Sequence, residues 1–270
     1  ENFRSHPDVL EHLYTEFNKS FVTNFSHAVV DAESDAIKRV VEGCRAHLEE
    51  KVTDPELRQR LTPNYRAGCK RLIVAGGFYE ALGQPHVELV TEAIERVEPD
   101  GGRSRDGRLH PLDVLVLATG FQTHQFMRPM QVTGLGGKKL DDVWAESNRS
   151  YLSISVPDFP NFFMLIGPYS PGGNFSLIGV AETQLEYVMQ LIDLLREGKT
   201  RQISANPAAT DRFFSEMVEA TKSTIWATGC QSWYIDKNGV TASRTWTYEH
   251  FENLMARPKL DEFDLVSGSH

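Results

Sequence analysis

The feature that most constrains the fold of this chain is a continuous apolar run, Val114–Ala118, inside the segment DVLVLATGF (Asp113–Phe121). Aliphatic and β-branched residues without polar alternation are typical of a central strand that is buried on both faces. A second run, Phe162–Ile166, has the same character. Because such strands need helices on both sides, the sequence predicts an α/β layered architecture.

Helical periodicity accounts for much of the remaining chain. Residues 1–62 are predicted to be helical, with an amphipathic stretch over 31–52 and a short helix that Asp54 and Pro55 open. The clearest helix of the second half covers 176–197. The other expected elements are strands at Leu72–Ala75, Val87–Val90, Ser232–Ile235 and Thr245–Thr247, and helices at Leu140–Glu146, 207–226 and Tyr248–Ala256.

Composition excludes several classes of protein. Lys and Arg number 28 against 37 Asp and Glu, a formal net charge of −9, and binding to a nucleic-acid backbone needs concentrated positive charge. No apolar run approaches the roughly 20 residues of a membrane-spanning helix. The three cysteines are odd in number and form no CxxC pair, which argues against a disulfide scaffold or a structural zinc site. A reducing, cytoplasmic location is therefore expected.

The usual short catalytic motifs are missing. The sequence contains no GxSxG, HExxH or GxxxxGK[ST], and no metal site is predicted. Gly134–Gly137 lacks the preceding strand and the spacing of a dinucleotide loop, so it is interpreted as a turn. Glu1 opens neither a native start nor a signal peptide, and Ser267–His270 is interpreted as a tail.

Two segments combine an expected strand with a loop suited to a ligand. The Ala-Thr-Gly turn after Val114–Ala118 lies where α/β sheets bind ligands, and Gly120 allows close approach to its backbone. Asn161–Ser176 leads from a strand through a Gly/Pro-rich loop into a helix N-terminus, which suits a carbonyl or phosphate. Ser176 can equally be a simple helix cap.

A third segment brings two cations into an apolar strand. Lys70 and Arg71 follow Gly68-Cys69 and precede Leu72–Ala75. Two positive charges in such a position require an anionic partner. From the residues alone, that partner is either an acidic side chain of the protein or a ligand.

Taken together, these pieces resemble the C-terminal half of a class B flavoprotein monooxygenase, the group that contains the Baeyer–Villiger monooxygenases. The resemblance covers Leu61 to Gly239 and is carried by LTPNYRAGCKRLIVAGGFYEAL, HVELV, DVLVLATGF, DDVW, FPNFFMLIGPYSP and GCQSWYIDKNGV. Such enzymes bind FAD and NADPH through two GxGxxG motifs, and neither occurs here. The implied fold is a partial two-dinucleotide-binding-domain flavoprotein. Residues 1–112 would be a helical segment and the end of the NADPH domain, 113–266 the second part of the FAD domain, and 267–270 a tail.

The resemblance also implies residue roles. Arg71 matches the family's active-site arginine, which faces the flavin and stabilises the negative peroxyflavin. Lys70 matches the lysine that contacts the 2′-phosphate of NADPH, and Trp233 a tryptophan beside the nicotinamide nucleotide. The remaining positions implied to line the cofactors are Thr119, Gly120, Phe121, Ser176 and Leu177.

The implied activity is hydride transfer from NADPH to FAD, followed by insertion of one oxygen atom of O2 into a ketone, or oxidation of a sulfide or amine. The implied partners are that small organic substrate and an N-terminal half, without which this chain is expected to be inactive. The alternative is a non-catalytic binding or interaction module derived from the same family. A pyridine-nucleotide disulfide reductase is disfavoured because no redox CxxC or CxxxxC occurs.

Overall fold

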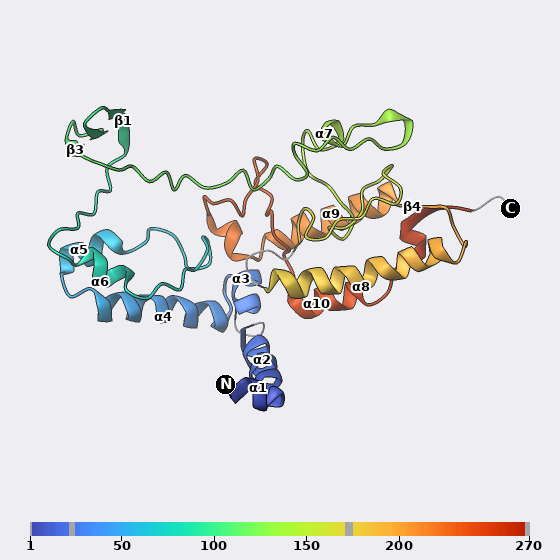
Figure 1. Cartoon of the computed structure of the whole chain (residues 1–270), viewed down its shortest axis with the longest axis horizontal. Coiled ribbons are helices and arrows are strands. Elements are labelled where there is room, and N and C mark those ends of the chain that lie inside the picture. Colours follow the sequence, from blue (N-terminus) through green and yellow to red (C-terminus); the bar gives the residue numbers. More distant parts are fainter. Residues whose placement is uncertain (1, 22–24, 171–174, 268–270) are drawn as a thin grey trace. The chain divides into compact units, whose positions relative to one another are not determined.

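The computed structural model describes residues 2–21, 25–170 and 175–267, which form two compact units. The first unit contains Glu1–Glu42, Tyr65–Leu72 and Thr123–His270, and the second contains Gly43–Asn64 and Ile73–Gln122. Figure 1 shows the elements of both units, with most of the helices labelled. Of the expected tail, only Ser267 lies within the described residues.

Helices dominate the first unit. Its helices, in chain order, are α1 (Asn2–Ser5), α2 (Pro7–Phe21), α3 (His27–Val30), the first part of α4 (Asp35–Lys51), η2 (Leu135–Gly137), α7 (Leu140–Val143), α8 (Leu177–Arg196), α9 (Pro207–Thr221), η3 (Ile225–Thr228), α10 (Tyr248–Met255) and η4 (Leu260–Glu262). The second unit contains the end of α4, α5 (Pro55–Leu61) and α6 (Phe78–Leu82). In the described ranges no helix is long and apolar enough to cross a membrane.

The helices expected from periodicity and capping are confirmed. Asp54 accepts a hydrogen bond from the Glu56 amide at 2.9 Å, and Pro55 opens α5. Asn206 caps α9 through the amides of Ala208 and Ala209. Two helices end earlier than expected: α7 ends at Val143, and α9 ends at Thr221, with η3 covering the next apolar residues.

The main core of the first unit forms around α8. Its buried side chains Val180, Tyr187, Val188 and Leu191 lie at helical spacings of seven (Val180 to Tyr187), four (Tyr187 to Leu191) and three (Val188 to Leu191), and so face one side of the helix. They pack against β4 (Gln202–Ala205), α9 and α10. The buried members of this cluster are Tyr151, Leu152, Ile154, Phe175, Val180, Tyr187, Val188, Leu191, Ile203, Ala205, Ala209, Phe213, Phe251, Met255 and Phe263.

The strands form two small antiparallel sheets. In the second unit, β1 (Ile94–Glu98), β2 (Gly101–Ser104) and β3 (Leu109–Pro111) pair in the order β1-β2-β3. Gly101 is required in β2 because a Cβ there would lie 2.2 Å from the His110 carbonyl oxygen. In the first unit, β4 pairs with β5 (Phe263–Val266), with Gln202 opposite Val266. The α/β class is confirmed as a mixture of helices and sheets.

The expected central strand is wrong for this chain. Val114–Ala118 is neither helix nor strand, and Val114, Val116 and Leu117 are 75%, 80% and 76% exposed. Leu72–Ala75 and Val87–Val90 likewise form no strand. The physical reason is that no neighbouring strand pairs with these segments within the described ranges, so their apolar side chains have nothing to pack against.

The other expected strands are reduced to isolated bridges or to irregular backbone. Phe162–Ile166 makes one bridge, between Phe163 and Ser155, and Ser232–Ile235 makes one, between Ile235 and Thr241. Thr245–Thr247 is irregular and ends at the cap of α10. These segments are held by packing against helices in place of a sheet ladder.

The packing around α8 predicts a large difference between two leucines of that helix. Replacing the fully buried Leu191 by Ala should lower the free energy of unfolding of the first unit by about 2–5 kcal/mol, because it leaves a cavity. Leu185→Ala on the same helix is the matched control: that side chain is 45% exposed, and the loss should stay below about 1 kcal/mol. Urea denaturation followed by circular dichroism measures both, and equal losses would contradict the packing.

Candidate functional site

The cations Lys70 and Arg71 lie at the exposed end of a segment whose start is buried. Gly68 has a φ of 84° and fits against Val29, where a Cβ would lie 3.3 Å from the valine Cγ1. Cys69, next along the chain, is 2% exposed. Lys70 and Arg71 then reach the surface, and the Lys70 ammonium lies 4.5 Å from the centre of the Tyr65 ring. The sequence thus fixes the cations by anchoring the two small residues before them.

A second segment, residues 229–236, carries the aromatic side chains of the site. Gly229 ends η3 with a φ of 90°, and the buried Cys230 follows. Trp233 is 43% exposed and stacks on Tyr234 at 4.0 Å between ring centres. Tyr234 is 2% exposed and packs in turn on Trp226. The exposed indole is therefore supported from beneath by a buried aromatic stack.

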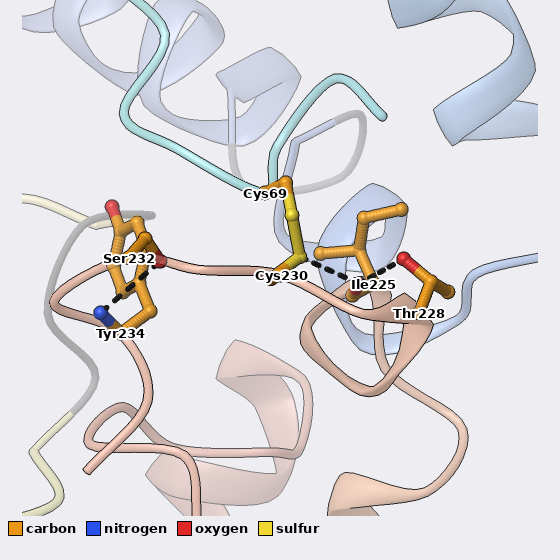
Figure 2. Close-up of a disulfide and its surroundings, with 6 residues drawn as sticks. All are labelled: Cys69, Ile225, Thr228, Cys230, Ser232 and Tyr234. Atoms are coloured by element: carbon orange, nitrogen blue, oxygen red, sulfur yellow. Dashed lines mark hydrogen bonds between the residues drawn. A yellow bond between two sulfur atoms is a disulfide. The ribbon is translucent and has the colours of Figure 1, made fainter. Parts of the chain in front are cut away.

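A disulfide between Cys69 and Cys230 brings the two segments together (Figure 2). The Cα atoms are 5.4 Å apart, inside the range that disulfides span. The argument against a disulfide scaffold did not anticipate this single bond, because an odd cysteine count and the absence of CxxC say nothing of two cysteines 161 residues apart. Only Cys44 is a free cysteine among the described residues.

Arg71 and Tyr234 are coupled electrostatically. Burial raises the pKa of the Tyr234 phenol, and a hydrogen bond with the Arg71 side chain acts in the opposite direction. Arg71 thus lies against the edge of the stack that supports Trp233. Two cations beside an exposed flat ring can bind a ligand with both an anionic group and an aromatic ring.

Ser176 and Leu177 lie at a separate place in the first unit, the N-terminus of α8. The Ser176 hydroxyl accepts a hydrogen bond from the Gly179 amide at 3.3 Å, so its role as a helix cap is confirmed. Leu177 is 50% exposed. A surface cavity of about 200 Å³ lies beside Ser176, with Tyr14 and Tyr248 in its wall.

The buried side chain of Gln184, on α8, forms hydrogen bonds with the loop before that helix. Gln184 accepts a hydrogen bond from the Ile166 amide at 2.7 Å and donates one to the Ser170 hydroxyl at 3.1 Å. Both bonds lie on the core side of α8. The Gly/Pro-rich loop is therefore held at both ends of Ile166–Ser170. Its continuation, residues 171–174 of the predicted site segment, lies outside the described residues.

The predicted site residues fall into three groups in the described structure. Lys70, Arg71 and Trp233 share the disulfide-linked region of the first unit. No interaction recorded for the described ranges joins Ser176 or Leu177 to them. Thr119, Gly120 and Phe121 belong to the second unit, where Gly120 has a φ of 89° and Phe121 is 95% exposed.

Sequence reasoning missed Tyr234 and the cysteine pair. No signal in the sequence marked the pair: Cys69 and Cys230 each follow a glycine, but so does Cys44, which is free. Tyr234 stands in the segment SWY, but the sequence does not indicate that Tyr234 is buried while Trp233 is exposed.

The chain is similar to curated monooxygenases over most of its length. It is 41% identical over 249 residues to an uncharacterised monooxygenase of Mycobacterium tuberculosis, an alignment that covers 92% of this chain and 50% of that protein. A FAD-binding monooxygenase of Aspergillus niger is 36% identical over 80% of this chain and 36% of its own length. A Baeyer–Villiger monooxygenase of Streptomyces coelicolor is 33% identical, with 80% and 42% covered. No family model matches.

Solved structures agree with the sequence relatives. The crystal structure of cyclohexanone monooxygenase from Rhodococcus sp. Phi1 bound to NADP+ superposes with a TM-score of 0.76 and 27% identity, covering 88% of this chain and 46% of that one. The chain is related to the C-terminal half of Baeyer–Villiger-type flavoprotein monooxygenases. It spans about half the length of the curated relatives it matches.

The Arg71–Tyr234 contact predicts a titration result. Arg71→Met should raise the pKa of the Tyr234 phenol further, because it removes the hydrogen bond and the positive charge that favour the phenolate. Ultraviolet absorbance of the phenolate during an alkaline titration measures this pKa, and the difference from Tyr234→Phe assigns it. Lys70→Met is the matched control, for which we expect no change. An unchanged or lower pKa in Arg71→Met would refute the contact.

Proposed function

We propose that this chain supplies the C-terminal half of an NADPH- and FAD-dependent monooxygenase of Baeyer–Villiger type. The observation that carries the proposal is that the Cys69–Cys230 disulfide and the Arg71–Tyr234 hydrogen bond join the segment of Lys70 and Arg71 to the segment of Trp233, in a chain related to these enzymes. A 2′-phosphate needs a cation, and a nicotinamide nucleotide needs a flat surface beside it. The region offers both, and the Rhodococcus relative in sequence and fold binds NADP+.

The residues present suit NADPH. Lys70 and Trp233 are exposed, so a nucleotide can reach them, and Arg71 is exposed while its guanidinium keeps a hydrogen bond to Tyr234. We assign Lys70 to the 2′-phosphate and Trp233 to the nicotinamide nucleotide. Arg71 is assigned to the reacting end, where a fixed cation stabilises negative charge as it develops.

The residues present also suit part of an FAD site. The first turn of α8 has amides without helix partners, and Ser176 satisfies one of them, that of Gly179. Gly120 has the positive φ that favours glycine, and a Cβ there would meet nothing within 4 Å, which leaves room beside its backbone. We assign Ser176 and Leu177, in the first unit, to this cofactor. Thr119, Gly120 and Phe121, in the second unit, are proposed to contact a nucleotide cofactor in the complete enzyme. When bound and reduced by NADPH, FAD supplies the transfer of one oxygen atom of O2 to a ketone, sulfide or amine.

The proposal includes a domain arrangement and a location. Residues 1–112 would complete an NADPH-binding domain and 113–266 an FAD-binding domain, each with strands from an N-terminal half that carries the GxGxxG motifs. The cytoplasmic location stays a prediction. The disulfide removes the cysteine argument for a reducing compartment.

The exposed apolar segments favour this enzyme over the alternative, a stand-alone binding module. A module that had adapted to work alone would have covered or charged such edges. Ile73 and Val74 are 75% and 103% exposed, and Val114–Leu117 is similarly uncovered. We propose that the N-terminal half covers both segments. A purified chain that is monodisperse and melts cooperatively would favour the module, whereas association would favour the enzyme half.

In the complete enzyme, Arg71→Ala should lower oxygenated product by about 100-fold or more while flavin reduction by NADPH continues, because a preorganised charge at the reacting centre is lost. NADPH oxidation and product formation with a ketone or sulfide panel measure the two steps separately. Arg71→Lys is the charge-preserving control and should retain more product than Arg71→Ala. Unimpaired product in Arg71→Ala would contradict the role, and no NADPH oxidation by the unaltered enzyme with any substrate would contradict the function.

Lys70→Ala should reduce the preference for NADPH over NADH by about tenfold or more, because a charge-assisted contact to the 2′-phosphate disappears. The ratio of kcat/KM values for the two nucleotides measures the preference. Lys222→Ala, which removes an exposed lysine of the same unit that pairs with Glu219, is the control. Unchanged selectivity in Lys70→Ala would refute the assignment.

A further inference from the structure

The Cys69–Cys230 disulfide is a covalent cross-link directly beside the cations Lys70 and Arg71 in the chain. It lies one residue from Lys70 and two from Arg71, and three residues before Trp233. Other contacts that hold the first segment lie earlier in the chain. There the Arg66 side chain donates a hydrogen bond to the Ala32 carbonyl oxygen and forms an ion pair with Glu33. The position of the cations relative to the indole therefore depends on this covalent bond together with the hydrogen bond between Arg71 and Tyr234.

The surroundings of the disulfide keep it out of bulk solvent. Cys69 and Cys230 are 2% and 9% exposed and belong to one apolar cluster with Val29, Ile225 and Trp226. The two cysteines are separated by 161 residues, so the intervening chain does not by itself keep them adjacent. The cluster is what brings the sulfur atoms together, and it would remain after the bond is broken.

The structure also offers a hydrogen-bond acceptor to the Cys230 thiol of the reduced state. The Cys230 Sγ lies 3.2 Å from the Ile225 carbonyl oxygen (Figure 2). A disulfide sulfur has no hydrogen to donate, whereas a thiol has one. The Ile225 carbonyl can therefore accept a hydrogen bond from Cys230 only when the bond to Cys69 is open. The Ile225 carbonyl oxygen therefore gives the Cys230 thiol a hydrogen-bond partner in the reduced state.

We propose that Cys69 and Cys230 are redox-responsive positioning residues. The disulfide holds the Lys70-Arg71 end against the Trp233-Tyr234 stack, in the arrangement that binds the nicotinamide nucleotide. Reduction removes the covalent link, leaves the two segments held only by the apolar cluster and the Arg71–Tyr234 hydrogen bond, and so loosens them and weakens that binding. The nucleotide part of this inference rests on the proposed function, whereas the bond and its effect on the two segments do not.

The chemistry balances with two classes of reagent. A dithiol reductant attacks one sulfur as a thiolate, the Cys69–Cys230 bond breaks, and the leaving thiolate takes a proton. The second thiol of the reductant resolves the mixed disulfide, so that two electrons and two protons pass to the cysteines. In the reverse direction, hydrogen peroxide oxidises one thiolate to a sulfenic acid, and the second thiol displaces hydroxide to give the disulfide and water.

The bond itself is tested on the 270-residue chain by alkylation and mass spectrometry. After peroxide treatment only Cys44 should react, and after dithiothreitol all three cysteines should react. Cys44→Ser is the matched control, because it removes the free thiol and leaves the pair. Three reactive thiols after peroxide treatment would overturn the proposal.

The effect on the two segments is tested by hydrogen exchange of residues 65–72 and 229–236 in the same chain. Exchange should be faster in the reduced form and in Cys230→Ser, and re-oxidation should restore protection in the unaltered chain but not in Cys230→Ser. Equal exchange in both forms would overturn the proposal.

The effect on binding is tested with NADP+ in the complete enzyme. The Kd should be about tenfold higher in the reduced form, because the ordering of the two segments must then accompany binding. The midpoint of this change in a redox titration should coincide with the midpoint from thiol labelling. An affinity that is independent of redox state would overturn the positioning role. NADP+ that binds neither form would contradict the proposed function, while labelling and exchange still decide the switch.

Discussion

An extended apolar segment needs hydrogen-bond partners for its backbone and neighbours that bury its side chains. The rest of this structure depends on that constraint. Between Val114 and Leu117 the backbone makes no recorded hydrogen bond within the described ranges, and the side chains are largely exposed. Both deficits vanish if another strand pairs on each side. The proposed N-terminal half would supply those strands, which also explains why the sheets of the described residues are small and do not include Val114–Ala118.

The helices could be predicted from the sequence because the forces that form them are local. The caps Asp54 and Asn206, the prolines after them, and the apolar spacing along α8 all lie within one element. Strands depend on partners. The composition of Val114–Ala118 predicts a strand that needs both faces covered, and in this chain that prediction is wrong, because composition says nothing of whether the covering layers are in the same chain.

The candidate site likewise has a part that the sequence indicates and a part that it does not. The resemblance identified Lys70, Arg71 and Trp233, and the structure places them in one region, although their roles are still proposals. The bond that joins them could not be predicted, because it depends on a contact across 161 residues. Arg244 is a similar case: sequence reasoning places an arginine at the surface. Here it is 1% exposed between Phe213 and Phe251, and burial lowers its pKa to about 9.

The most direct test of the account is amide hydrogen exchange at Val114–Ala118, compared between this chain alone and the complete protein with FAD bound. The account predicts rapid exchange in the isolated chain and strong protection in the complete protein, where the segment becomes a paired strand. Protection already present in the isolated chain, or its absence in the complete protein, would contradict the claim that this chain is half of a two-nucleotide flavoenzyme.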